Sequence, residues 1–347
     1  MSTLKGTIVV TGANGALGSA IAQRIASKPE LSAYHGVYTV RDAAAAPALT
    51  SALGASAHPH DVVSLDLTDL ENVRQAANDI NARVSAGGIP PIRALILAAG
   101  FQDFGKQSWT TDGLDTTFAA NYLGHFLLTL LLLQSIDKEA GRVVVIGSQG
   151  HDPDDPRNTR SKAFADEKYR TIAPSDAAGF DAVARGAWSA AAEDASFRGG
   201  FRRYGAAKLF LVMMQHELQG RLGRDATLEN VSVLGVDPGT MISGLQRLAP
   251  WFIRVVLFGV VYPLVLWLRP EGGPVRSAAR SAGDVLEAAV GAVGVEGGLP
   301  RDLYFDGRVP LETSAESRDV GKRKLVWSES VRYAGLEEGD TVLGDWQ

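Results

Sequence analysis

The sequence predicts an α/β fold in which a doubly wound parallel β-sheet carries helices on both faces. Short β-branched runs alternate with Ala- and Leu-rich stretches over the first two-thirds of the chain, as strands alternate with crossover helices in such a sheet. Several of these runs are apolar along their whole length, which is typical of strands covered on both faces. We predict one domain over residues 1–347, although length alone would also allow two.

Six runs are the predicted strands, and two long stretches are the predicted helices that matter most for the site. The strands are Thr7–Val10, Gly36–Val40, Val62–Asp66, Ala94–Ala98, Arg142–Ile146 and Val231–Val236. The helices are Asp112–Gln134 and Phe201–Leu222. Because open α/β sheets bind ligands at the carboxyl ends of their strands, the residues that follow these runs are the first candidates for a functional site.

The composition is that of a globular protein, with 46% hydrophobic and 21% charged residues. A net charge of −5 gives no electrostatic reason to expect nucleic acid as a partner. The absence of cysteine excludes disulfides, thiolate metal sites and a cysteine nucleophile, and we predict no metal. Met1–Gly6 leaves no room for a charged region and a separate hydrophobic signal core, so we expect a cytoplasmic enzyme.

Two segments interrupt the alternation of strands and helices. Residues 151–202 are rich in Asp, Arg, Ala and Gly, so we predict an insertion with some helix that covers the substrate, mediates association as a homodimer, or is a disordered decoration. Residues 245–275 contain the apolar run Trp251–Leu268, which Pro263 interrupts. This run is shorter than the about 20 residues of a transmembrane helix, so we predict no span. A substrate-covering helix pair is favoured over peripheral attachment to a membrane.

A glycine-rich turn follows the first predicted strand, in the segment TIVVTGANGALGSAIAQRIA. Gly12, Gly15 and Gly18 would allow a tight turn, close approach of a pyrophosphate and close packing of helix on strand. The N–H groups at the start of the following helix would face the phosphate charge. Because a strand precedes the turn and an amphipathic helix follows it, the segment predicts a Rossmann-type dinucleotide site.

Two polar residues at strand ends bear on the choice of dinucleotide. Arg41 ends the second strand, where an acidic residue would bind the 2′-hydroxyl of NAD, and its guanidinium suits the 2′-phosphate of NADP instead. We therefore favour NADP(H) as the cofactor, with NAD(H) as the alternative. Asp66 ends the third strand, where adenine would lie, although it could equally cap the helix that follows.

The pattern YGAAK places Tyr204 and Lys208 four residues apart, on one face of a predicted helix. A tyrosine has an ordinary pKa of about 10, and a nearby ammonium lowers that pKa by stabilising the phenolate. The preceding strand ends in VVVIGS, which delivers Ser148 to the edge of the sheet where ligands bind.

Together these motifs resemble the short-chain dehydrogenase/reductase family over about residues 5–245, and the stretch TTDGLDTTFAANYLGHFLLTLLLL is similar to its retinol-dehydrogenase and WW-domain-oxidoreductase branch. ALILAAG resembles the fourth-strand motif of the family, NYLGHF its asparagine region and VDPGTMIS its Pro-Gly segment. The resemblance assigns a catalytic tetrad to Asn121, Ser148, Tyr204 and Lys208.

The resemblance implies that hydride passes between nicotinamide and a carbonyl carbon while Tyr204 transfers a proton to or from the oxygen. Ser148 would hold that oxygen, and Lys208 would lower the tyrosine pKa and bind the nicotinamide ribose. Asn121 would kink its helix and hold a water that links Lys208 to solvent. The implied cofactor-binding residues are Thr11, Gly12, Asn14, Gly15, Ala16, Leu17, Gly18, Arg41, Asp66, Leu67, Ala98, Ala99, Gly100, Asn121, Tyr204, Lys208, Pro238, Gly239 and Ser243.

The sequence departs from the family pattern in three places. Its glycines are spaced GxxGxxG, a spacing more usual in sugar-nucleotide epimerases, with Ala16 where simpler members often carry glycine. Ala98 stands where asparagine is common in the fourth-strand motif. Between Ser148 and Tyr204 lie 55 residues, more than the family usually has.

We therefore expect an NADP(H)-dependent ketoreductase or alcohol dehydrogenase that acts on an apolar, aromatic or polyketide-like small molecule of secondary metabolism. The predicted substrate-lining residues are Gln149, Trp251, Phe252, Leu257 and Phe258. Two alternatives stay open at this point: an NAD-retaining epimerase or dehydratase, which the glycine spacing suggests, and a catalytically idle nucleotide-sensing protein, against which the intact tetrad argues.

Overall fold

The computed structural model describes residues 4–269, 275–291 and 298–347, and its strands form one sheet in the order β3-β2-β1-β4-β5-β6-β7-β8. The strands are β1 (Thr7–Val10), β2 (His35–Val40), β3 (His60–Ser64), β4 (Ile92–Leu97), β5 (Arg142–Ile146), β6 (Ser232–Asp237), β7 (Tyr304–Asp306) and β8 (Val309–Pro310). Neighbouring strands from β3 to β7 pair in parallel, and only β8 is antiparallel. The predicted parallel α/β fold is confirmed.

The predicted strands lie within two residues of the observed ones, with one consequence for the site. β3 ends at Ser64, so Asp66 lies beyond the strand instead of ending it. The amide of Asp66 donates to Asn72 Oδ1, and its carboxylate accepts from the amide and the hydroxyl of Thr68, so the chain turns here. β7 and β8 were not predicted, because three and two residues are too few to show a strand period.

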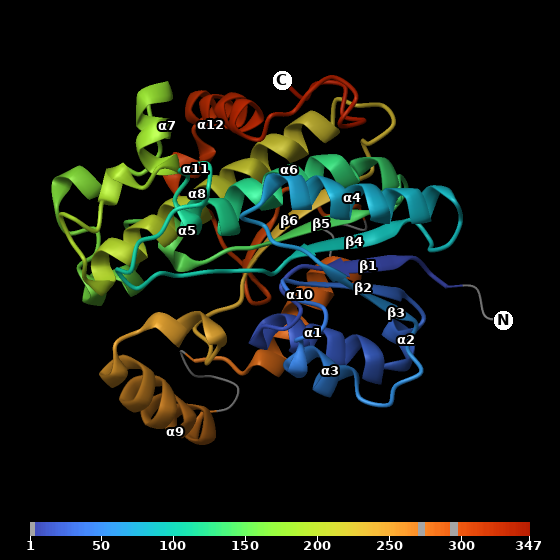
Figure 1. The fold of residues 1–347 in the computed structure, drawn as a ribbon, viewed down its shortest axis with the longest axis horizontal. Helices are drawn as coiled ribbons and strands as arrows, with labels where there is room; N and C mark the ends of the chain where they lie inside the picture. The colour runs from blue at the N-terminus through green and yellow to red at the C-terminus, as the bar shows by residue number, and fades with distance from the viewer. Residues whose placement is uncertain (1–3, 270–274, 292–297) are drawn as a thin grey trace.

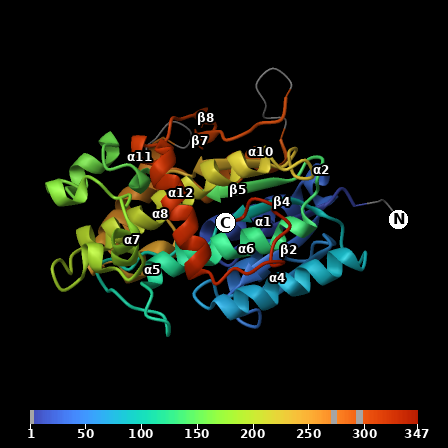
Figure 2. The same ribbon diagram turned by 90° about the horizontal axis from the view of Figure 1, so that it is seen from above.

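Helices cover both faces of the sheet (Figure 1). One layer contains α1 (Ala16–Ser27), α3 (Pro47–Leu53) and α10 (Ala278–Val290). The other contains α4 (Leu70–Ser85), α6 (Gly124–Leu132) and α8 (Phe197–Leu222), and α12 (Val320–Tyr333) packs on α8 from outside, as Figure 2 shows. Two short helices, α2 (Pro29–Ser32) and α11 (Ala315–Arg318), complete these layers. Each layer has its own apolar core against one face of the sheet.

A continuous helical run crosses the second layer from Thr116 to Ser135. It contains α5 (Thr116–Phe118), the π-helical turn η1 (Ala119–Leu123), α6 and η2 (Leu133–Ser135). It begins four residues later than predicted because the carboxylate of Asp115 caps it, accepting from the amides of Thr117 and Phe118. The run is long and apolar enough to cross a membrane, but 89% of its apolar window is buried inside the fold, so we assign it to the core.

The insertion is folded and packs on α8 and α12. Its helices are η3 (Gln149–His151), η4 (Pro156–Ser161), η5 (Glu167–Tyr169), α7 (Ala177–Ala184) and η6 (Ala187–Ser189). Phe180 is fully buried and stacks on Phe210 of α8. Ser196 caps α8, because its hydroxyl accepts a hydrogen bond from the Arg198 amide in the first turn of that helix. α8 therefore begins at Phe197 instead of the predicted Phe201. The disordered alternative for this segment is therefore wrong.

The apolar run after β6 forms one helical arm. η7 (Gly244–Leu248) leads into the π-helix η8 (Ile253–Val261), which continues as α9 (Tyr262–Leu268). Pro263 does not break the run into the predicted pair, because it lies in the first turn of α9, where a missing amide hydrogen is tolerated. The Tyr262 amide instead donates to Leu257 five residues back, in the wide turn of a π-helix.

Candidate active site

A cavity of about 1030 Å³ lies at the carboxyl edge of the sheet. The segments that follow β1 to β6 all contribute residues to its wall, as the sheet topology predicts for a ligand site. Single small-molecule sites typically occupy about 300–1,000 Å³, so the cavity has room for a dinucleotide and part of a second molecule.

The glycine-rich turn forms one end of this cavity, and its backbone requires glycine. Gly12 has φ +66°, and a Cβ atom there would lie 2.6 Å from Ala99 Cα. A Cβ atom on Gly18 would lie 2.5 Å from the Gly12 carbonyl oxygen. Gly15 precedes α1 and caps it without a side chain. The first amides of α1 therefore have no side-chain partner at the cap and can bind an anion.

Two residues that were predicted to contact the dinucleotide, Thr11 and Asn14, form hydrogen bonds within the protein. Thr11 is fully buried and does not line the cavity; its hydroxyl accepts from the Ala99 amide and bonds His125 Nε2 at 2.9 Å, so in this structure its side chain joins the loop after β4 to the helical run instead of facing the cavity. Asn14 lines the cavity, and its Oδ1 accepts from the amides of Ala48 and Leu49 at the start of α3.

Arg41 lies at the cavity wall just beyond β2, and the structure adds a second arginine that the sequence did not indicate. Arg247 of η7 lines the same cavity, and the positive charge of Arg41 contributes, after burial, to lowering the pKa of Arg247. Neither guanidinium forms an ion pair within the described part of the chain. Two unpaired cations that face one cavity favour an anionic ligand group between them.

Ser148, Tyr204 and Lys208 all line this cavity. Ser148 follows β5, and both other residues lie on α8, which passes the end of β5. The Ser148 hydroxyl accepts from the Gly150 amide at 3.2 Å. The Lys208 ammonium donates to the Ile146 carbonyl oxygen at 2.7 Å and lies 5.6 Å from the centroid of the Tyr204 ring.

The electrostatics of this group differ from the expectation. Burial raises the pKa of Tyr204 above its ordinary value, and hydrogen bonding to Ser148 offsets the rise only in part. Burial also lowers the pKa of Lys208 to about 8, although the Asp237 carboxylate opposes that change. Burial outweighs any lowering of the Tyr204 pKa by Lys208, whose ammonium donates to the Ile146 carbonyl oxygen in this structure.

Asn121 is fully buried behind the cavity and does not line it, contrary to its prediction as a cofactor contact. It lies in the π-helical turn η1, where its amide nitrogen donates to the carbonyls of Phe101 and Thr117 and its Oδ1 accepts from the Phe101 amide. Its own carbonyl oxygen bonds His125 Nδ1 at 3.2 Å. Asn121 thus fixes the loop after β4 to the helix.

Comparison with known proteins identifies the family to which the chain belongs. Residues 6–157 match the family model of the short chain dehydrogenases. The short-chain dehydrogenase iccH of Talaromyces variabilis is 40% identical over 365 aligned positions, covering 99% of this chain and 99% of the relative. The chain belongs to the short-chain dehydrogenase/reductase family. It is therefore an oxidoreductase of a family that uses NAD(P)(H).

More distant relatives and solved structures align with most of the length of this dehydrogenase. Protochlorophyllide reductase of Daucus carota is 26% identical, and the alignment covers 96% of this chain and 79% of that relative. Polyprenol dehydrogenase of Mus musculus is 27% identical, and the alignment covers 97% of this chain and 86% of that relative. An uncharacterized protein of Mycobacterium paratuberculosis has TM-score 0.59 at 23% identity, covering 97% and 96% of the two chains. The angucycline C-6 ketoreductase LanV has TM-score 0.56 at 16% identity, covering 88% and 95%. These structures support the fold.

The nicotinamide cofactor of the family fits the cavity of this dehydrogenase. The uncapped start of α1 and the two glycines without room for a side chain suit a pyrophosphate. The remaining predicted contacts also line the cavity; these are Ala16, Leu17, Asp66, Leu67, Ala98, Ala99, Gly100, Pro238, Gly239 and Ser243. Ser243 in addition caps η7 through a capping box with Gln246.

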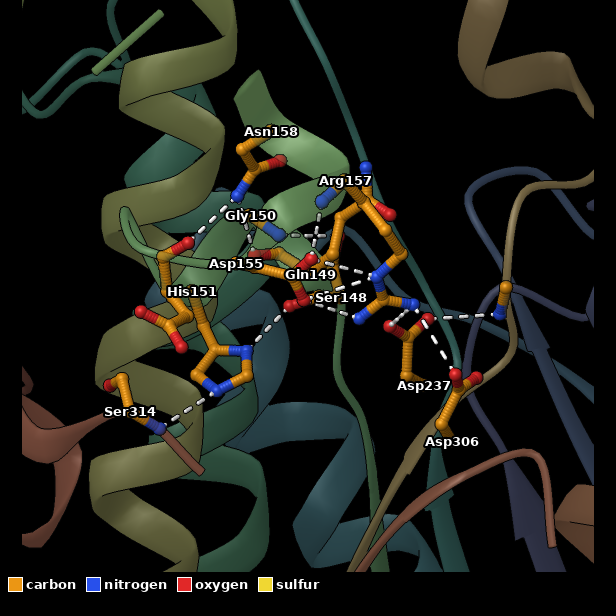
Figure 3. Close-up of polar contacts among 12 residues, drawn as sticks. Ser148, Gln149, Gly150, His151, Asp155, Arg157, Asn158, Asp237, Asp306 and Ser314 are labelled. Carbon is orange, nitrogen blue, oxygen red and sulfur yellow. Dashed lines mark hydrogen bonds and ion pairs between the residues drawn. The ribbon is translucent and has the colours of Figure 1, made fainter. Parts of the chain in front are cut away.

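Behind Ser148 of the dehydrogenase lies a polar cluster that the sequence did not indicate (Figure 3). His151 Nδ1 bonds the Ser148 carbonyl oxygen at 2.6 Å. Arg157 of η4 lies 3.2 Å from the Asp237 carboxylate and also pairs with Asp155 and Asp306. Through these contacts the insertion holds the ends of β5, β6 and β7 together. None of these contacts requires a bound substrate.

The other end of the cavity is apolar and is built by α8 and the arm. Phe197 and Phe201 of α8 line it, together with four residues of the arm, Ile253, Leu257, Phe258 and Tyr262. Of the predicted lining residues, Gln149, Leu257 and Phe258 are at the wall. Trp251 and Phe252 are not; each is 64% exposed on the outside of the arm, so these two predictions are wrong. Between η3 and α8 the insertion contributes nothing to the wall.

Proposed function

We propose that the protein is an NADP(H)-dependent ketoreductase or alcohol dehydrogenase for an apolar small molecule. One observation carries the proposal: Ser148 and Tyr204 line the same cavity as the glycine-rich turn and a group of aromatic and aliphatic side chains from α8 and the arm. A reacting carbonyl beside Tyr204 would therefore have a cofactor site on one side and an apolar pocket on the other.

The chain's own residues supply binding and proton transfer in this reaction. A bound nicotinamide supplies or accepts the hydride. The Ser148 hydroxyl holds the carbonyl oxygen, and the Tyr204 phenol donates a proton to that oxygen during reduction or accepts it during oxidation. Lys208, held beside the tyrosine ring, stabilises the phenolate that remains after proton donation. The apolar wall excludes water from the reacting carbon.

The preference for NADP(H) rests on charge. Arg41 and Arg247 present two unpaired guanidinium groups to the cavity beside the end of β2. A planar guanidinium binds phosphate oxygens in a bidentate manner, which suits the 2′-phosphate of NADP better than a ribose hydroxyl. Asp42, which also lines the cavity, accepts from the Ala44 amide within its own turn.

Replacing Arg41 by aspartate should weaken NADPH binding by about tenfold, because a charge-assisted hydrogen bond contributes about 1.5–3 kcal/mol and the exposed position favours the lower end. NADH binding should stay unchanged or improve. Titration of both reduced cofactors by protein fluorescence measures the two dissociation constants. Arg301→Asp, an equal charge change at an exposed residue outside the cavity, is the control. Equal affinity of the wild type for both cofactors would contradict the assignment to Arg41.

The pH dependence of carbonyl reduction should reflect the buried lysine. Lys208 carries its charge below its pKa of about 8 and loses it as the pH rises through that value. Since the phenolate that forms at Tyr204 then loses its stabilising cation, kcat/KM for reduction should fall with rising pH above about 8. A pH series of initial rates in one constant-ionic-strength buffer checks this. A profile that stays flat to well above that pH would show that Lys208 charge does not limit the step.

The apolar substrate class is best tested directly. Initial rates of reduced-nicotinamide oxidation should rise along a homologous series of ketones as the apolar part lengthens, because each buried methylene contributes about 0.8 kcal/mol. Leu257→Ser should flatten that dependence, whereas Val309→Ser, at an exposed residue outside the cavity, should leave it unchanged. A series with no dependence on chain length would contradict an apolar site. We also propose that the protein belongs to the retinol-dehydrogenase and WW-domain-oxidoreductase branch of the family, as the stretch TTDGLDTTFAANYLGHFLLTLLLL suggests.

A further inference from the structure

The arm formed by residues 251–268 has two different faces. Its inner face contributes Ile253, Leu257, Phe258 and Tyr262 to the cavity wall. Within the arm no residue is fully buried. In Figure 1 the arm lies apart from the sheet. The arm is therefore a thin layer with the cavity on one side and its surroundings on the other.

The outer face is apolar and exposed. Trp267 is 78% exposed, and the other exposed large side chains of the arm are Trp251, Phe252, Val255, Val260, Val261, Leu264 and Leu268. Scattered apolar residues are ordinary on a protein surface, but eight large exposed apolar side chains within the 18 residues of the arm indicate a place where another apolar surface binds. The two tryptophans lie near the opposite ends of the arm, a placement that suits the boundary between lipid and water.

The charged residues of the arm itself, and of the chain that leads into it from β6, are all basic, and the next acidic residue in the sequence is Glu271. From Pro238 to Pro270 the sequence contains no Asp or Glu, although the whole chain has a net charge of −5. Arg247, Arg254 and Arg269 lie in this stretch. Arg254 and Arg269 are exposed, and neither forms an ion pair with a residue that the structure describes. An apolar face edged by unpaired cations is complementary to an anionic amphiphilic surface.

A second copy of the chain fits this face less well than a lipid surface does. A twofold interface brings the same patch of both copies together, so the arginines of one copy would face those of the other with no acidic residue of the stretch to separate them. An anionic bilayer offers headgroups to the arginines and an acyl boundary to the tryptophans at once. With 16 helical residues from Ile253 to Leu268, the arm is too short to span and would lie in the interface.

We propose that the arm docks the protein on an anionic membrane surface, with its outer face in the lipid interface and its inner face roofing the active-site cavity. The docking stands on the exposed apolar face and its charges alone. A consequence rests on the proposed function: an apolar substrate dissolved in the lipid reaches the cavity past the arm without crossing water. The cytoplasmic location expected from the sequence would present the arm with a negatively charged leaflet.

Co-sedimentation of the full-length protein with vesicles tests the docking without any turnover. The vesicles are phosphatidylcholine alone and phosphatidylcholine mixed with phosphatidylserine. We expect binding to the mixed vesicles, weaker binding to the neutral ones, and at least a tenfold loss of partition for Trp251→Ser/Trp267→Ser, because two large apolar side chains no longer enter the interface. Arg254→Gln/Arg269→Gln should reduce the preference for anionic vesicles by roughly fivefold per arginine.

Trp109→Ser is the matched control, because Trp109 is 55% exposed, belongs to a different segment of the chain and does not line the cavity. It should bind vesicles like the wild type, and all variants should keep the wild-type thermal midpoint and NADPH affinity. Failure of the wild type to bind mixed vesicles overturns the proposal, as does wild-type binding by the Trp251→Ser/Trp267→Ser variant. A wild-type dimer that this variant converts to a monomer, with no lipid binding, assigns the face to a second copy instead. Vesicle binding by a protein that oxidises no cofactor would leave the docking intact and contradict only the proposed function.

Discussion

Replacing Tyr204 by phenylalanine should lower kcat by about 10²- to 10⁴-fold, the usual contribution of a positioned general acid. Tyr204 lines the cavity beside Ser148, and phenylalanine keeps its ring in place against Phe201 while removing the transferable proton. The dissociation constant for the reduced cofactor should change little, since the glycine-rich turn and the two arginines are untouched. Steady-state rates together with fluorescence titration separate these two effects.

Tyr262→Phe provides the control for this variant. Tyr262 also lines the cavity, but it lies on the arm and not beside Ser148, so loss of its hydroxyl should leave kcat close to the wild-type value. If Tyr204→Phe kept more than roughly a tenth of wild-type kcat, far above the range for loss of a general acid, the assignment of Tyr204 would be wrong. Equal losses in both variants would instead indicate a general effect of hydroxyl groups in the cavity.

The sheet and its catalytic edge could be predicted because their signals are local. Strands buried on both faces are apolar throughout, and Tyr204 and Lys208 share a helix face at a spacing of four. Strand β7 gives no such signal; it is three residues long, and its place depends on pairing of Tyr304 with Gly235, 69 positions earlier. Short edge strands of this kind follow from tertiary packing and not from local propensity.

The errors at the site have similar physical causes. Arg157 and Asp237 lie 80 positions apart, so only the folded insertion reveals their ion pair. The resemblance to the family placed the apolar run after the Pro-Gly segment at the substrate site, but an apolar pattern on every side of a helix does not define which residues, such as Trp251 and Phe252, face outward.

Replacing Arg203 by methionine should destabilise the fold by about 3–5 kcal/mol, the usual cost of removing one partner from a buried ion pair. The Arg203 side chain is 3% exposed; its Nε donates to Asp103 at 2.8 Å and lies 3.7 Å from the Asp115 carboxylate. Its Nη1 also donates to the Ser189 carbonyl oxygen in the insertion. Loss of the cation leaves two carboxylates, 1% and 2% exposed, without their common counter-charge.

Urea unfolding of wild type and variant at several pH values measures this effect and identifies its origin. Burial already raises the pKa of Asp115, and removal of Arg203 should raise it further. A carboxyl whose pKa is raised on folding favours the folded state only while it is protonated, so the deficit of the variant should shrink as the pH falls and grow as it rises through the raised pKa. Arg185→Met, which breaks the exposed pair with Asp181, should cost less than about 1 kcal/mol at every pH. A deficit for Arg203→Met as small as that of the control, or one independent of pH, would show that the buried carboxylates do not depend on this arginine for their charge.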